Sequence, residues 1–386
     1  MHLPNYKDNS IVNLTASILS VTGKKKQYST LKILESKKIN SKNIVLIILD
    51  GLGYEFMKQY KKSSFLGKNI IGKITSVFPP TTAAAITTYL TGKAPGEHGV
   101  TGWFVYLKEL DVISTILPFT QRGKQKPLTD VGATAADIFD QDTIFQSVER
   151  DSYIITNDLI AESTYSRYFG RGATTIPYKR GKIESFTSTI KNTLDSSNNA
   201  KFIYAYWSKF DTFSHEYGIG SEKTKQHFEK LDRKLKTLLK NCHNNDTTFL
   251  ITADHGLIDT TRERTIYLSE HPDLKKLLSM PLSGEPRTAF CFVKPDKEKE
   301  FIEYHKNNLK NCCHLIKSSE LIKKKAFGLF NTHKNLNSRI GDYILLMKKN
   351  YAFKDFLPEE EEYFHVGNHG GVSKEEIYVP LIYYRS

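Results

Sequence analysis

Four short runs of apolar, β-branched and aromatic residues constrain the fold more than any other feature of this sequence. They occupy residues 43–49, 153–155, 202–207 and 248–253. Runs this short and continuous are typical of strands that are buried on both faces, as in parallel sheets. Three of the four are followed closely by an aspartate, namely Asp50, Asp211 and Asp254.

Helical patterns lie between these runs. The clearest spans residues 223–239 and carries one apolar stripe, formed by Phe228, Leu231, Leu235, Leu238 and Leu239. Strands that alternate with helices predict a parallel sheet covered by helices on both faces. Because such sheets bind ligands at the carboxyl ends of their strands, we expect the three aspartates to lie at a functional site.

The periodic pattern weakens in the second half of the chain. Residues 257–359 hold short helical patterns, lysine runs and one strand-like run at 288–293. We interpret 257–359 as a cap or lid inserted into a catalytic α/β core formed by 43–256 and 360–386. Residues 1–42 are expected to pack on this core as an N-terminal segment.

The net charge and the cysteine content exclude fewer classes of protein than the apolar runs do. The net charge of +13 is usual for a solvated lysine-rich surface, and it would also attract a phosphorylated substrate. Nucleic acid is an alternative partner, although no recognisable nucleic-acid-binding module accompanies the charge. The four cysteines lack the spacing of a disulfide framework or a thiolate zinc site. Without a signal-peptide pattern or a long apolar run, the default expectation is a cytoplasmic protein, with signal-less export as the alternative.

Acid and imidazole groups recur at spacings that suit metal binding. Asp211 and His215 would share one side of a helix. Asp254 and His255 end an apolar run, and His369 lies in a glycine-rich loop. Each feature alone has an ordinary structural interpretation, such as a helix-capping aspartate or a surface histidine. Together they predict a metal site, because carboxylate and imidazole are common zinc ligands.

One further segment predicts an anion site. Pro79 and Pro80 lead into an alanine-rich helical segment, which places Thr81 and Thr82 at a helix N-terminus. Free N–H groups and the positive end of the helix dipole favour an anion there. A plain threonine N-cap is the alternative interpretation.

In these features the chain resembles the type I phosphodiesterase and nucleotide pyrophosphatase branch of the alkaline phosphatase superfamily. The resemblance spans residues 43–371. It rests on residues 48–51, 79–92, 96–99 and 254–256, on Asp211 with His215, and on His369 with Gly370. It implies an α/β fold, namely an alkaline phosphatase-like three-layer α/β/α sandwich with a mostly parallel sheet and an inserted cap.

The resemblance also implies two divalent metal ions, most readily zinc, with manganese or iron as alternatives. It places one ion among Asp50, Thr82, Asp254 and His255, and the other among Asp211, His215 and His369. Thr82 is preferred to Thr81 as the nucleophile because it precedes Gly92 by ten residues, as the nucleophile of the family does. The implied reaction passes through a phosphorylated Thr82 that water then hydrolyses.

The implied function is hydrolysis of a phosphodiester or pyrophosphate bond in a nucleotide-like small molecule. A phosphomonoesterase, or a phosphonate or sulfate ester hydrolase, is the alternative on the same site, and a non-enzymatic polyanion-binding protein is a third reading. The resemblance places an asparagine three residues after the nucleophile, where this chain has Ala85. The preference for diesters over monoesters is therefore open.

Several residues are weaker candidates for substrate contacts. Trp103 and Phe104 could form an aromatic platform for a nucleobase, although consecutive aromatic residues also serve packing. Arg287 is a candidate phosphate contact from the cap, and His365 is a candidate for a group that lies beside the metal ligands or contacts the substrate. His98 is interpreted as structural.

Overall fold

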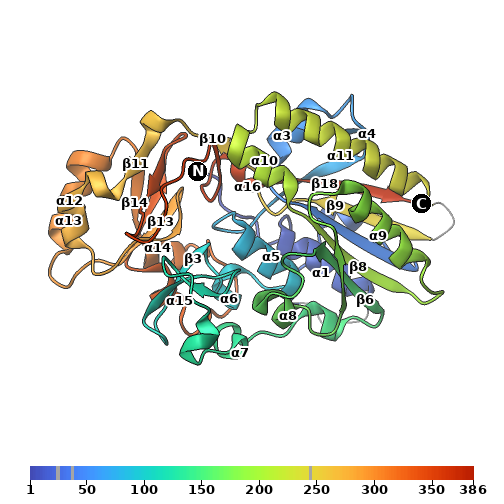
Figure 1. The fold of residues 1–386 in the computed structure, drawn as a ribbon, viewed down its shortest axis with the longest axis horizontal. Helices are drawn as coiled ribbons and strands as arrows, with labels where there is room; N and C mark the ends of the chain where they lie inside the picture. The colour runs from blue at the N-terminus through green and yellow to red at the C-terminus, as the bar shows by residue number, and fades with distance from the viewer. Residues whose placement is uncertain (23–26, 36–38, 243–245) are drawn as a thin grey trace.

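The computed structural model describes residues 1–22, 27–35, 39–242 and 246–386, and two seven-stranded sheets organise it (Figure 1). The core sheet has the strand order β2-β18-β9-β1-β8-β6-β7. Its strands are β1 (Asn43–Leu49), β2 (Ile70–Thr75), β6 (Asp151–Asn157), β7 (Thr174–Tyr178), β8 (Lys201–Trp207), β9 (Thr247–Thr252) and β18 (Tyr378–Arg385).

Five neighbouring strands of the core sheet, β9-β1-β8-β6-β7, run parallel. All seven residues of the central strand β1 are buried, which explains its uninterrupted apolar sequence. Leu46 pairs with Tyr204 on one side and with Leu250 on the other. Strand β18 is antiparallel to both of its neighbours. The sheet is therefore mostly parallel, as predicted.

Helices cover both faces of the core sheet, and Figure 1 shows α1, α5 and α8 on one face and α9, α10 and α11 on the other. These helices are α1 (Ile11–Val21), α5 (Thr82–Thr91), α8 (Thr164–Phe169), α9 (Ile183–Asp195), α10 (Lys209–Tyr217) and α11 (Glu222–Lys240). The shorter helices of the core are α2 (Lys32–Glu35), α3 (Tyr54–Gln59), α4 (Phe65–Lys68), α6 (Pro95–His98), α7 (Ala135–Phe139) and α16 (Lys374–Ile377). This arrangement confirms the predicted α/β class.

Helix α11 confirms the helical pattern expected at residues 223–239. Its predicted apolar stripe is buried, and the Ser221 hydroxyl accepts a hydrogen bond from the Thr224 N–H at the helix start. The stripe packs into the main hydrophobic cluster, which also contains the strands of the core sheet.

The second sheet, here called the cap sheet, is antiparallel with the order β14-β15-β13-β12-β3-β4-β5. Its strands are β3 (Phe104–Leu107), β4 (Val112–Thr115), β5 (Thr120–Gln121), β12 (Ser283–Glu285), β13 (Thr288–Cys291), β14 (Cys313–Lys317) and β15 (Tyr343–Met347). Three of them come from residues 104–121, outside the segment interpreted as the cap. The cap sheet is thus built from two distant parts of the chain, joined where Gly284 pairs with Phe104.

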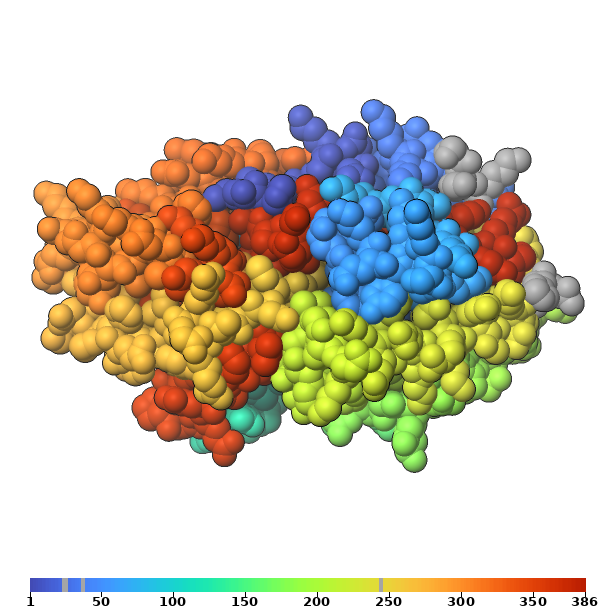
Figure 2. All heavy atoms as spheres, turned by 90° about the horizontal axis from the view of Figure 1, so that it is seen from above, coloured from blue at the N-terminus to red at the C-terminus, as the bar shows by residue number. Residues whose placement is uncertain are grey.

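Short helices and two small strand pairs complete the cap region. Its helices are α12 (Pro272–Leu277), α13 (Glu298–Tyr304), α14 (Ser318–Lys323) and α15 (Leu336–Ile340). Strand β10 (Ile258–Asp259) pairs with β17 (Gly367–Asn368), and β11 (Thr265–Tyr267) pairs with β16 (Ala352–Lys354). The space-filling view shows the cap region, in orange, forming one end of an elongated molecule (Figure 2). Among the described helices, none combines the length and the apolar character needed to span a membrane.

Candidate active site

Three of the predicted metal ligands meet where β1 and β9 end. Asp50 follows β1, and Asp254 and His255 follow β9, so the parallel pairing of these strands brings them together. The Nε2 atom of His255 lies 3.4 Å from Asp50 Oδ1 and 3.6 Å from Asp254 Oδ2. All three side chains are buried. Ligand atoms of these residues lie within 4.8 Å of one another, a spacing that suits one metal ion.

A second group lies beside the first. Asp211 and His215 occupy successive turns of α10, and His215 Nε2 lies 3.2 Å from Asp211 Oδ2. The His369 ring stacks on the His255 ring at a centroid distance of 3.8 Å and lies 5.2 Å from the His215 ring. Ligand atoms of Asp211, His255 and His369 also fall within 4.8 Å of one another. His255 therefore stands between the two groups, whereas the resemblance assigns it to one ion.

The donor atoms of these residues fit metal ions. Four of the buried side-chain atoms that have no hydrogen-bond partner among the described residues belong to this cluster, namely Asp50 Oδ1, Asp211 Oδ1, Asp254 Oδ2 and His369 Nδ1. Buried polar atoms without a partner are costly, so a cluster of them implies a ligand that satisfies them. Oxygen and imidazole nitrogen atoms in this number suit zinc, manganese or iron.

Backbone carbonyls orient two of the imidazoles. His215 donates from Nδ1 to the Gly367 carbonyl at 2.7 Å, and His255 donates from Nδ1 to the Gly256 carbonyl at 3.1 Å. This tautomer leaves Nε2 of each ring as a lone-pair donor that faces the carboxylates. Asp254 Oδ1 is similarly held, because it accepts from the Gly51 and His255 N–H groups at 3.0 Å each.

The electrostatics of the cluster reflect its crowded charges. Burial, and then the neighbouring carboxylates of Asp254 and Asp211, raise the pKa of Asp50 well above its ordinary value. Burial would also raise the pKa of Asp211, but the adjacent His215 outweighs it and lowers that pKa. A bound cation would relieve the repulsion among the acids.

Thr82 presents its hydroxyl to this cluster from the first residue of α5. Thr81 is the N-cap, and the Thr82 Oγ1 atom lies 3.1 Å from His255 Nε2. Among the two threonines considered, Thr82 therefore contacts a predicted ligand, whereas the Thr81 hydroxyl donates to Glu285.

A cavity of about 630 Å³ opens beside Thr82 and is also lined by Asp50 and Asp211. Its apolar wall includes Ile86, Leu90, Leu117, Ile154 and Phe169. Ala85 does not line this cavity and is fully buried in the main hydrophobic cluster. The position where the resemblance places an asparagine thus holds a buried alanine that does not contact this cavity.

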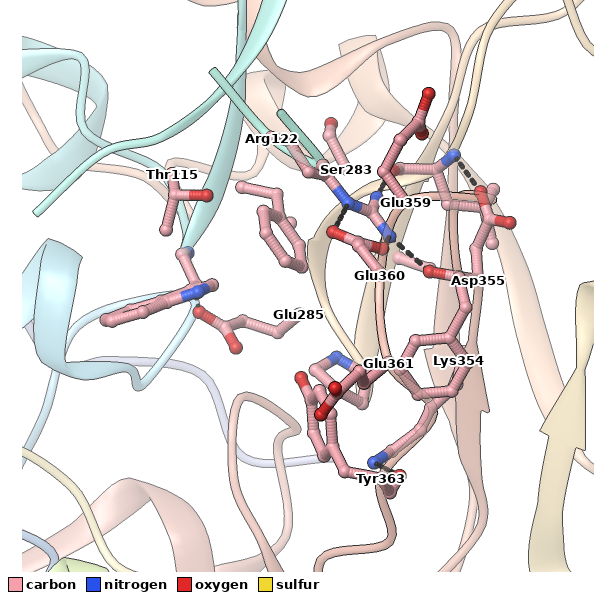
Figure 3. A pocket seen from close by; sticks show the side chains of 18 of the residues that line it. Thr115, Arg122, Ser283, Glu285, Lys354, Asp355, Glu359, Glu360, Glu361 and Tyr363 are labelled. Carbon is pink, nitrogen blue, oxygen red and sulfur yellow. Dashed lines mark hydrogen bonds and ion pairs between the residues drawn. The ribbon is translucent and has the colours of Figure 1, made fainter. Parts of the chain in front are cut away.

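A second cavity, of about 780 Å³, lies on the cap side of the site (Figure 3). Trp103 lines both cavities and is 36% exposed. Phe104 lines only the second, and the Arg122 guanidinium lies 4.0 Å above its ring. Arg122 Nε in turn donates a hydrogen bond of 2.9 Å to the Glu360 carboxylate, and Figure 3 shows the two side chains facing each other. Trp103 is therefore the better placed of the two aromatic side chains to contact a substrate beside Thr82.

Arg287 is not available to bind phosphate, which corrects the sequence-based interpretation. Its guanidinium is 1% exposed and forms two hydrogen bonds of 2.7 Å with the Glu376 carboxylate. The carbonyls of Lys349 and Tyr351 accept its remaining hydrogen bonds. Arg287 therefore ties the cap sheet to α16.

Two further histidines, His365 and His98, were singled out from the sequence, and they lie at different distances from the cluster of proposed ligands. The His365 ring lies 4.4 Å from the His215 ring, and burial lowers the pKa of His365 to about 3. It remains a candidate for a group beside the metal ligands. The buried His98 lies instead within 3.1 Å of the Thr88 hydroxyl on α5, as a structural role requires.

The sequence interpretation missed three polar residues at the site. Asn157 ends β6 and lines the cavity beside Thr82, so the strand-end signal that marked the aspartates could have found it. Tyr206 donates its hydroxyl to Asp50, and its place inside an apolar strand hid that role. Glu285 is 6% exposed, and burial raises its pKa to about 7. No pattern in the sequence marks Glu285.

Comparisons with known proteins agree with this geometry. Residues 44–372 match the family described as type I phosphodiesterase / nucleotide pyrophosphatase. Among curated proteins, none shows significant sequence similarity to this chain.

Solved structures show the same fold at low sequence identity. Murine ectonucleotide pyrophosphatase / phosphodiesterase 5 is 17% identical, with a TM-score of 0.66 over 88% of this chain and 87% of that chain. An inactive variant of the murine protein, in complex with AMP, is 16% identical, with a TM-score of 0.65 over 88% of this chain and 87% of that chain. Phosphonoacetate hydrolase from Sinorhizobium meliloti 1021, in complex with phosphonoformate, is 16% identical, with a TM-score of 0.63 over 88% of this chain and 89% of that chain. The chain therefore belongs to the type I phosphodiesterase / nucleotide pyrophosphatase family of the alkaline phosphatase superfamily, and is a phosphoester hydrolase.

Proposed function

We propose that this protein cleaves a phosphodiester or pyrophosphate bond in a nucleotide-like molecule, with Thr82 as the nucleophile and two divalent ions, most readily zinc, in the site. The observation that carries this proposal is the position of the Thr82 hydroxyl. It lies at a helix start, 3.1 Å from His255 Nε2, and beside buried carboxylates with oxygens that have no hydrogen-bond partner in the described part of the chain.

Each ligand group has a defined role in this proposal. Asp50, Asp254 and His255 would hold one ion, together with Thr82, and Asp211, His215 and His369 the other. When bound, the two ions supply the Lewis acidity that makes a threonine hydroxyl nucleophilic and offsets charge on the phosphoryl oxygens.

The reaction of the chain itself has two displacements. In the first, Thr82 Oγ1 bonds to phosphorus, the bond to the leaving oxygen breaks, and the hydroxyl proton passes to the leaving group. In the second, a water oxygen attacks the same phosphorus, the Thr82–phosphorus bond breaks, and the Thr82 hydroxyl is restored. The first turn of α5 presents its N–H groups to the phosphoryl oxygens throughout.

The cavity beside Thr82 supports a nucleotide-like substrate. Its volume of about 630 Å³ and its apolar wall suit a group of nucleoside size. Asn157 and Tyr206 add polar groups to that wall. The AMP complex of the murine neighbour is consistent with a ligand of this class.

A hydrolase of monoesters or phosphonates is the second candidate. Phosphonoacetate hydrolase shares the fold nearly as closely as the nucleotide pyrophosphatase neighbour does. Relative rates on a diester and a monoester with the same leaving group separate the two candidates.

Replacing the nucleophile tests the proposal directly. We expect the wild-type protein to hydrolyse bis(p-nitrophenyl) phosphate faster than p-nitrophenyl phosphate, to stop after chelation and to recover when zinc is added. Thr82→Ala should lower kcat by roughly a thousandfold or more, because no other hydroxyl can form the intermediate, while bound zinc, measured by atomic emission, stays nearly unchanged.

Thr81→Val is the matched control, since it removes the neighbouring hydroxyl and leaves Thr82 in place. Its kcat should remain within about fivefold of the wild-type value, because the Thr81 hydroxyl forms no bond to phosphorus in the proposed reaction. Full activity of Thr82→Ala would sink the assignment, and a faster rate on the monoester would favour the second candidate.

A further inference from the structure

Glu285 joins the cap sheet to the start of helix α5. It ends β12, and its Oε1 atom accepts hydrogen bonds from the Thr81 hydroxyl at 2.5 Å and from the Trp103 N–H at 2.7 Å. Figure 3 shows Glu285 on the opposite side of the second cavity from Asp355. A cap residue thus contacts the residue next to the proposed nucleophile and the residue that lines both cavities.

The bond to Glu285 has a consequence for the start of α5. A threonine at an N-cap ordinarily accepts a hydrogen bond from the N–H two or three residues further on, which closes the helix end. Thr81 makes no such side-chain bond. Within the described part of the chain, the N–H groups of Thr82, Ala83 and Ala84 find no acceptor, and the first helical bond runs from the Ala85 N–H to the Thr81 carbonyl.

We propose that Glu285 is a positioning residue, which holds the Thr81 hydroxyl away from the first turn of α5 and so keeps its N–H groups free for the phosphoryl group of the substrate. The inference rests on the proposed function, because the phosphoryl group is the one that Thr82 attacks. Uncapped N–H groups at a helix start bind anions well, and this start faces the metal-ligand cluster through Thr82.

The same carboxylate positions Trp103. The backbone N–H of Trp103 donates to Glu285, and the Trp103 residue lines both cavities. When Glu285 is shortened to alanine, the Thr81 hydroxyl becomes free to accept from the Ala83 or Ala84 N–H. That competing cap would occupy the donors that the substrate needs.

A cycle of four variants tests this competition, using Glu285→Ala, Glu285→Gln, Thr81→Val and the double variant Glu285→Ala/Thr81→Val. Initial rates are measured with bis(p-nitrophenyl) phosphate and saturating zinc. Glu285→Ala should lower kcat/KM by about 10- to 100-fold, the range seen when anion-stabilising donors are lost. The double variant should recover most of that loss, because no hydroxyl remains to close the helix start, and such non-additivity marks a direct coupling.

Glu285→Gln is the conservative control. Its amide oxygen can accept the same two hydrogen bonds, so kcat/KM should stay within about threefold of the wild-type value. This outcome separates the hydrogen-bonding role from any role of the carboxylate charge.

A binding measurement gives a readout that does not depend on turnover. Inorganic phosphate should raise the melting temperature of the wild-type protein and of the double variant, and much less that of Glu285→Ala. The chain has two tryptophans, and Trp207 is fully buried, so acrylamide quenching of fluorescence reports on Trp103. Quenching should increase in Glu285→Ala and in the double variant, because both lack the acceptor for the Trp103 N–H.

Two results would overturn the inference. Equal losses in Glu285→Ala and in the double variant would reduce Glu285 to a structural tie between cap and core, and wild-type rates in Glu285→Ala would remove its role altogether. Failure of the proposed function looks different, because the wild-type protein would then hydrolyse neither nitrophenyl ester. The phosphate-binding comparison among the four variants would still decide the role of Glu285.

Discussion

The surroundings of His227 change the pKa of its imidazole. Its Nε2 atom accepts a hydrogen bond from the Trp207 indole N–H at 3.2 Å, and its ring stacks on Phe213 at a centroid distance of 4.7 Å. Burial lowers the pKa of His227 to about 4. The neutral form is thus the one that the folded protein accommodates.

This pKa predicts an acid-dependent loss of stability. The unfolded chain binds the proton more readily, near the ordinary histidine pKa of about 6.5, so the contribution of His227 to stability is complete above that pH and is lost as the pH falls towards 4. His227→Gln keeps an acceptor for Trp207 without titrating, and its free energy of unfolding in urea should fall less between pH 7 and pH 4.5.

His2→Gln, at an exposed position, is the control and should keep the wild-type pH dependence. Identical pH profiles for His227→Gln and the wild-type protein would show that another group governs the acid transition.

The sequence predicted the clustering of the proposed metal ligands better than the contacts of the residues around them. Asp50, Asp254 and Asp211 follow buried strands, and strand ends of a parallel sheet converge, so their proximity could be inferred without coordinates. Arg287 could not be interpreted correctly, because nothing in its surroundings reveals a partner 89 residues away at Glu376. Glu285 was missed for the same reason, since both of its hydrogen-bond donors come from residues about 200 positions earlier.

At the scale of elements, the ion pair between Arg287 and Glu376 links the β12–β13 hairpin to α16. Both side chains are almost fully buried, at 1% and 0% exposure. The same Glu376 carboxylate accepts from the Gly371 N–H at 2.7 Å, two residues after the predicted ligand His369. The pair thus supports the loop that positions His369.

Breaking this pair should be strongly destabilising. Arg287→Met leaves the Glu376 carboxylate buried without its cation, and we expect the free energy of unfolding in urea to fall by about 3–5 kcal/mol. Lys276→Met removes the exposed pair with Asp273 and should cost less than about 1 kcal/mol. Similar small losses in both variants would show that Glu376 is compensated by its other partners.

Elements of the core were predictable, whereas the make-up of the cap was not. Continuous apolar runs in the sequence predicted β1, β8 and β9. A strand that is buried on both faces needs apolar side chains at successive positions, so it leaves such a run. The strands β3 to β5 are two to four residues long, too short to show a period. Their assignment to the cap sheet depends on pairing with β12, far along the chain, which no local pattern reports.

At the scale of the whole molecule, the proposed ligands come from separate parts of the chain. They follow β1 and β9, begin α5, lie on α10 and belong to the loop after β17. Ions bound there would stabilise the folded chain relative to the unfolded one, in which no such cluster exists.

Metal removal should therefore lower the melting temperature. At a zinc concentration about a thousand times the dissociation constant, binding contributes about 4 kcal/mol, which corresponds to a shift of several degrees in differential scanning calorimetry. Asp254→Asn should show a much smaller shift, because Asp254 Oδ2 is buried and has no hydrogen-bond partner among the residues that the structure describes. A melting temperature that responds to neither chelator nor zinc would contradict the presence of a resident metal.

The place of β18 in the core sheet protects a strand edge beside the candidate active site. This strand, residues 378–385, lies between β2 and β9, so β9, the strand that leads to Asp254 and His255, has one open edge until β18 pairs with it. Exposed strand edges invite pairing with other chains. A chain that lacks β18 should therefore expose this edge of β9 and tend to aggregate.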